Sequence, residues 1–145
     1  MRITIKEIKD VASLHQTMGG LQSPQDFSSI INPPHDEYYF ARKKLIAYLE
    51  SLEYEKILEL ETLMVFGREW YYHAQFEDDE ELDEYEEEEP FSIDIVNCFG
   101  CFQEYVGKPE GKSDAILYLT AKINLAQYLR AALQHCNPDE ITLPL

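Results

Sequence analysis

Apolar side chains recur at helical spacing along most of the chain. In residues 3–18 they fall three and four positions apart, at Ile5, Ile8, Val11, Ala12, Leu14 and Met18. Residues 36–52 and 54–74 have the same period, so each segment predicts an amphipathic helix with one face in a core. Residues 2–6 also alternate as a strand would, which leaves the first turn open between helix and strand.

The last third of the chain predicts two more helices. Residues 93–106 place apolar side chains along one side, after Ser92 as a cap and before the stop at Gly107 and Pro109. Residues 114–135 carry two apolar rows, namely Ile116, Leu119, Ile123, Ala126, Leu129 and Leu133, and Leu117, Tyr118, Ala121, Leu125, Tyr128 and Ala132. Because two rows make a wide buried surface, we expect this helix at the centre of the fold. The apolar tail at 141–145 should dock on the body.

Two segments interrupt the helical pattern. Residues 19–35 contain two adjacent glycines and three prolines, which is typical of a flexible linker. Residues 77–89 are almost entirely acidic, and like charges at helical spacing repel one another, so we expect a mobile acidic loop. Gly67 disfavours the middle of a helix and suggests a break there. The predicted fold is therefore all-α: one domain over residues 1–145, a bundle of about five helices.

The charge of the chain narrows the classes of partner. The net charge is −16, and residues 77–89 hold 11 of the 28 acidic residues, whereas 17 acids face 12 Lys and Arg elsewhere. Such a surface repels phosphates and anionic membranes, so we expect no direct contact with nucleic acid or membrane, and a basic protein as partner. The charged N-terminal residues lead us to expect no signal peptide, no apolar run is long enough to predict a membrane span, and three cysteines are too few for a disulfide framework. These features predict a cytoplasmic protein, and they leave a homodimer open.

Two segments together resemble a known family. Residues 52–68, a Leu-rich helix that runs into Gly67-Arg68, and residues 118–133, with Tyr118-Leu119 and then Leu125-Ala126-x-Tyr128-Leu129, are similar to the uncharacterised bacterial family called domain of unknown function 3775. The resemblance covers about the second two-thirds of the chain. This sequence departs from the pattern at four positions: Val65, Glu69, Ala121 and Ile123. The resemblance implies a small helical cytoplasmic protein and supplies no activity or catalytic residue.

The composition most typical of a binding surface occurs at one place. Arg, Trp and Tyr are enriched at interface hot spots, and they lie together in Arg68, Glu69, Trp70, Tyr71 and Tyr72. The acidic run that follows would attract a basic partner, with some apolar grip from Tyr85; its candidate contacts are Asp78, Asp79, Glu80, Glu81, Asp83 and Tyr85. The alternatives are a packed helix end, with Arg68 paired to nearby acids, and a solvated tether.

A second interpretation concerns metal binding. Cys98 and Cys101 have the spacing of half a zinc site or of a redox pair, and His135 with Cys136 would complete four ligands. The alternative is that thiols among apolar neighbours pack as small hydrophobes. No catalytic or phosphate-binding motif is present, so we predict no cofactor and a non-enzymatic interaction protein of inhibitor, immunity or nucleic-acid-mimic type. A metal- or ligand-binding protein comes second, and an enzyme with an unrecognised site third.

Overall fold

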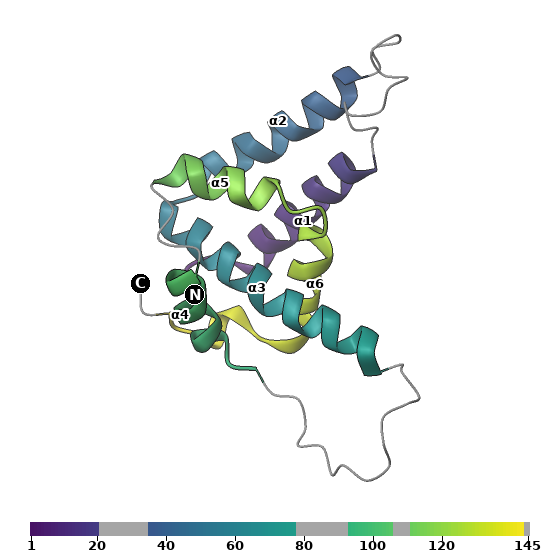
Figure 1. The fold of residues 1–145 in the computed structure, drawn as a ribbon. Coiled ribbons are helices and arrows are strands. Elements are labelled where there is room, and N and C mark those ends of the chain that lie inside the picture. Colours follow the sequence, from purple (N-terminus) through teal and green to yellow (C-terminus); the bar gives the residue numbers. More distant parts are fainter. Residues whose placement is uncertain (21–34, 78–92, 106–110, 144–145) are drawn as a thin grey trace.

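The structure, a computed structural model, describes residues 1–20, 35–77, 93–105 and 111–143. In these ranges every regular element is helical, which confirms the predicted all-α class (Figure 1). The elements are α1 (Ile5–Gly19), α2 (His35–Ser51), α3 (Tyr54–Glu77), α4 (Ile95–Tyr105), α5 (Lys112–Thr120), α6 (Leu125–His135) and the 3-10 helix η2 (Pro138–Glu140). Of the predicted linker and acidic loop, only residues 19, 20, 35 and 77 lie among the described residues.

The central helix of the bundle is α3, which crosses the middle of the molecule in Figure 1. It packs against α4, α5 and α6, and α6 also packs against α1. Between positions 57 and 67 almost every side of α3 is buried, including Glu59, Glu61 and Thr62 among the polar residues. A helix buried all round belongs in the core. The prediction that residues 114–135 form the central helix is therefore wrong.

Those residues form two helices instead of one, with a break at residues 121–124 between α5 and α6. A broken helix leaves carbonyls at one end and N–H groups at the other without intrahelical partners. Buried His15 of α1 contacts backbone groups of both kinds at the break. Its Nε2 lies 2.9 Å from the carbonyl oxygen of Lys122, and its Nδ1 accepts from the N–H of Ala126 at 3.4 Å. Two predicted core residues are exposed: Ile123 in the break is 88% exposed, and Leu117 on α5 is 53% exposed.

Side-chain caps define the starts of two helices. Thr4 and Glu7 form a reciprocal capping box, so α1 begins at Ile5 and its first turn is helical rather than a strand. At α4, the Asp94 carboxylate accepts from the N–H of Val96 at 2.9 Å. Asp94 therefore serves the role that the sequence suggested for Ser92, which lies outside the described residues.

The two ends of the described chain meet over α3. The Met1 amine donates to the carbonyl oxygens of Pro138, at 2.9 Å, and Ile141. Just beyond it, the carboxylate of buried Glu59 accepts from the N–H groups of Arg2, at 2.9 Å and 3.0 Å, and of Ile3, at 3.3 Å. Leu143 is buried, which confirms the docking predicted for the C-terminal tail as far as the described residues extend.

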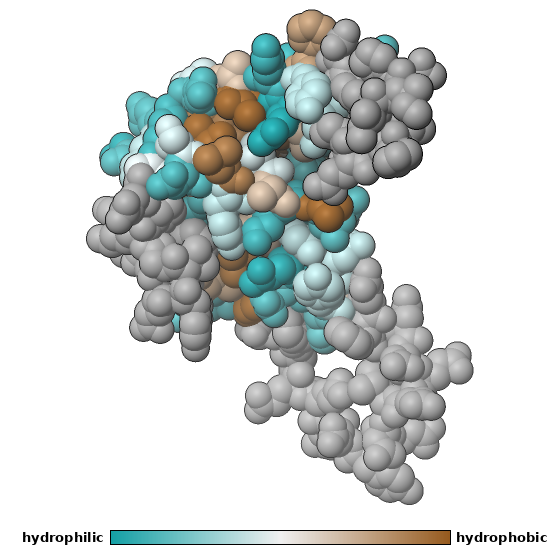
Figure 2. Space-filling model, turned by 45° about the horizontal axis from the view of Figure 1, so that its top comes forward, coloured by the Kyte–Doolittle hydropathy of each residue, from teal (hydrophilic) through white to brown (hydrophobic). Residues whose placement is uncertain are grey.

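Hydrophilic residues cover much of the surface, with hydrophobic ones between them on the face shown in Figure 2. The exposed large apolar side chains include Tyr39 and Phe40 on α2 and Leu117 on α5. No helix in the described ranges combines the length and the apolar content that crossing a bilayer requires.

Candidate interaction surface

Gly67 determines how the candidate segment is held. The helix continues through it, which confirms the single helix predicted over residues 54–74 and excludes the alternative of a break at this residue. A Cβ on Gly67 would lie 1.7 Å from the carbonyl oxygen of Tyr128 and 2.6 Å from its carbonyl carbon. The missing side chain therefore lets the backbone of α6 lie directly against α3. This contact brings the C-terminal third of α3, with Arg68 to Tyr72, beside α6.

The indole of Trp70 lies at the centre of a group of rings. It stacks on the His135 imidazole from α6, with ring centroids 3.9 Å apart and an interplanar angle of 3°. It meets Phe66 and His73 edge to face, at centroid distances of 6.4 Å and 6.0 Å. Aromatic pairs in these arrangements contribute about 0.5–1.5 kcal/mol beyond the area they bury. Trp70 thus joins the end of α3 to the end of α6.

The two tyrosines after Trp70 surround Tyr128 of α6. The ring centroids of Tyr71 and Tyr72 lie 5.5 Å and 6.2 Å from that of Tyr128. The hydroxyls of Tyr72 and Tyr128 are 3.1 Å apart, and this hydrogen bond is the main cause that raises the pKa of Tyr72. Tyr128 is buried, whereas Tyr72 remains 43% exposed. We call Trp70, Tyr71, Tyr72, His73, Tyr128 and His135 the aromatic surface.

Charged groups flank the aromatic surface. The Arg68 guanidinium lies 3.9 Å from the Glu69 carboxylate, and both side chains are partly exposed, so the pair contributes little to stability. The pairing agrees with the alternative that Arg68 meets a nearby acid. The C-terminal end of α3 has the negative pole of the helix dipole, and Glu77 is its last residue. The remaining candidate contacts, Asp78, Asp79, Glu80, Glu81, Asp83 and Tyr85, lie outside the described residues.

The four residues of the metal interpretation have different environments. Cys98 is buried in α4, His135 stacks on Trp70, and burial raises the pKa of the Cys136 thiol to about 11. Cys101 belongs to α4, but its side chain is not among those described. Within the described part of the chain, no three His, Cys, Asp or Glu residues are grouped so that they could hold a metal ion. A thiol with a raised pKa is a poor ligand and a poor nucleophile at neutral pH.

Sequence reasoning missed the half of the surface that α6 supplies. The sequence pattern puts Tyr128 in an apolar row and indicates His135 only as a metal ligand. The two are seven residues apart, which puts them on the same side of a helix and could have indicated a shared role. Their position against residues 70–73 depends on the close approach at Gly67, which no local pattern indicates.

Comparison of the chain with protein-family models, curated proteins and solved structures finds no match.

Proposed function

We propose that the chain is a non-enzymatic cytoplasmic protein that binds a basic partner protein. In this proposal the partner contacts the aromatic surface and Arg68, while the acidic run at 77–89 attracts and holds its positive charges. An inhibitor, an immunity protein or a mimic of nucleic acid is a concrete form of such a role. The observation that supports it best is the exposed Tyr72 edge of the aromatic surface, on a helix that leads directly into 11 acidic residues.

Each part of the proposed surface has a distinct physical task. Aromatic and Arg side chains supply most of the affinity at interfaces, because they exclude water over a large area at small entropic cost. Stacking between Trp70 and His135 holds these rings in place before a partner arrives. A dense negative run accelerates encounter with a basic protein and weakens as salt screens it.

We also propose that the likeness to domain of unknown function 3775 reflects a shared helical scaffold. Support comes from the contact between its two segments, since Gly67 from the first packs against Tyr128 from the second. The scaffold alone implies no activity.

The test begins with capture of basic proteins on the immobilised full chain at low salt, followed by affinity measurements on the purified partner. Between about 50 and 300 mM salt, the affinity should fall by at least about tenfold. Replacing the acids at 78–81 with Asn and Gln should weaken binding and reduce this salt dependence. Tyr72→Ala should weaken binding about tenfold, within the range of interface hot spots.

Tyr39→Ala is the matched control, because Tyr39 lies on α2 and is 46% exposed, nearly the same as Tyr72. It should leave the affinity unchanged. A partner whose affinity is insensitive both to salt and to the acid-to-amide replacements would refute the electrostatic part of the proposal. Equal losses from Tyr72→Ala and Tyr39→Ala would refute the assignment of the aromatic surface.

A further inference from the structure

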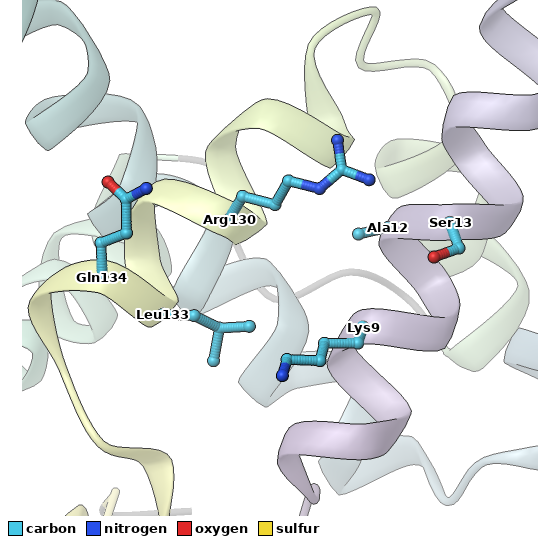
Figure 3. Close-up of a pocket in the computed structure, with 6 residues that line it drawn as sticks. All are labelled: Lys9, Ala12, Ser13, Arg130, Leu133 and Gln134. Carbon is cyan, nitrogen blue, oxygen red and sulfur yellow. The ribbon is translucent and has the colours of Figure 1, made fainter.

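A groove follows the seam between α1 and α6. It consists of three adjoining hollows of about 400, 410 and 370 Å³. Arg130 lines the first and second hollows, and Lys9 and Leu133 line the first and third, so the three share walls. Figure 3 shows the central hollow, formed by Lys9, Ala12 and Ser13 from α1 and by Arg130, Leu133 and Gln134 from α6.

The groove is positively charged, unlike the chain as a whole. Lys9 and Arg130 are both exposed, and neither has a carboxylate within ion-pair distance in the described ranges. The Arg130 guanidinium extends toward α1 in Figure 3 and donates a hydrogen bond to the side-chain oxygen of Gln16. Of the described residues that line the groove, only Asp139, in the third hollow, is acidic. Two unneutralised cations in a chain of net charge −16 define a local site for anionic groups.

The rest of the lining suits a peptide backbone. Carboxamide side chains both donate and accept hydrogen bonds, as peptide groups do. Five of them line the three hollows: Gln16, Asn124, Gln127, Gln134 and Asn137. Ala12 and Leu133 supply apolar contact in the central hollow, and Gly19 and Gly20 leave room at one end.

The length of the groove favours a chain over a small molecule. Helix α1 has 15 residues, and lining residues occur from Ile5 to Gly20, so at a rise of about 1.5 Å per residue the groove extends over about 22 Å. A small molecule would occupy one hollow, whereas an extended peptide of about seven residues would pass through all three. Alternate side chains of such a peptide would point toward the same wall, at the period of a strand.

We propose that the α1–α6 groove binds an extended acidic segment of a partner protein, whose carboxylates pair with Lys9 and Arg130. Arg130 can hold a carboxylate with two parallel hydrogen bonds, and Lys9 adds a point charge. The site shares no residue with the acidic run or the aromatic surface, and it selects the opposite kind of charge. It therefore extends the proposed function to a second contact and does not depend on it.

The test uses a fluorescein-labelled seven-residue peptide of alternating Glu and Val, titrated with the full chain and read by fluorescence anisotropy. The double variant Lys9→Gln with Arg130→Gln should weaken binding by at least about tenfold. The control variant Lys43→Gln with Lys44→Gln changes the net charge equally at two exposed lysines on α2 and should bind as the wild type does. A peptide with Gln in place of Glu should not bind.

Three results would overturn the proposal. Equal weakening by the two double variants would mean that general charge attraction is responsible. Equal binding of the Gln peptide would mean that carboxylates are not selected. A failure of the peptide to bind, together with a dimer in sedimentation that Lys9→Gln with Arg130→Gln dissociates, would assign the groove to a second copy of the chain. Because both substituted side chains are exposed, an unchanged unfolding midpoint is expected and verifies that the variant folds.

Discussion

Buried His15 contacts the backbone at the break between α5 and α6, where the helical hydrogen bonds are interrupted. Its contacts to the Lys122 carbonyl and the Ala126 N–H require a neutral ring with the proton on Nε2. Burial lowers its pKa below 6.5, and the hydrogen bond to Lys122 opposes part of that shift. Protonation of Nδ1 would place two donors against each other, so the charged ring is incompatible with the break between α5 and α6.

The contribution of His15 to stability should therefore decrease as the pH falls below about 6.5. In that range the unfolded chain binds a proton at His15 and the folded chain does not, so protonation favours unfolding. His15→Gln should cost about 1–3 kcal/mol at about pH 8, since a buried carbonyl and N–H lose well-placed partners. Urea unfolding of both proteins should show this difference shrinking toward about pH 5. A difference that stays constant with pH would contradict the assigned ring state.

Two buried glutamates on α3 differ in their hydrogen-bond partners, and this difference decides whether each carboxyl stabilises or destabilises the folded protein. Glu59 accepts from two backbone N–H groups near the N-terminus, whereas neither oxygen of fully buried Glu61 has a hydrogen-bond partner among the described residues. Burial raises the pKa of both, and that of Glu61 reaches about 8. Glu61 is therefore neutral in the folded protein at pH 7 and ionised in the unfolded chain.

Substituting these glutamates should have opposite effects. Between about pH 4.5 and 8 the unfolded chain releases the Glu61 proton and the folded chain keeps it, so the contribution of Glu61 lowers stability as the pH rises through this window, opposite in sign to that of His15. Glu61→Leu should remove that slope and raise the free energy of unfolding by about 2–3 kcal/mol at pH 7. Glu59→Leu should lower it by about 2 kcal/mol or more, because two N–H groups lose their acceptor. Chemical denaturation across pH measures both, and a loss of stability in Glu61→Leu would contradict this account.

At the level of the elements, the close packing of α3 against α6 depends on Gly67. Gly67→Ala would favour an isolated helix by about 1 kcal/mol, but the added Cβ would overlap the Tyr128 backbone and push α6 away. We expect a net destabilisation of about 2 kcal/mol or more. Gly100→Ala in α4 is the control, since its Cβ would meet no neighbouring element of the described structure within 4 Å, and it should stabilise by about 0.5–1 kcal/mol. Thermal unfolding compares them, and equal effects would refute the close contact.

The elements that the sequence predicts well are those whose pattern is local. The periods of residues 36–52 and 54–74 predicted α2 and α3 to within three residues. The break at 121–124 has no proline or glycine, and it is stabilised by His15, more than 100 residues earlier, so periodicity predicted one continuous helix. The same distinction applies to the aromatic surface. Local composition identified residues 68–72, whereas the roles of Tyr128 and His135 depend on how two helices far apart in the sequence cross.

For the molecule as a whole, charge is divided unevenly along the chain. Eleven acids lie in residues 77–89, and the remaining 17 face 12 Lys and Arg. The central helix ends at this acidic run, and its last turns form the aromatic surface together with Tyr128 and His135 of α6. The basic α1–α6 groove has the opposite charge. The two proposed contact regions thus differ in charge, and separate variants can test them.

Trp70 allows the central claim to be tested directly, because it is the single tryptophan of the chain and lies within the aromatic surface. The measurement is Trp70 emission and its quenching by acrylamide during titration with the captured basic partner. The partner is prepared so that its own tryptophans do not emit, and the signal therefore comes from Trp70 alone. If the partner covers the aromatic surface, the emission should shift and quenching should decrease with the same midpoint as binding. Saturated binding with unchanged emission and unchanged quenching would show that the partner binds elsewhere and would contradict the proposed function.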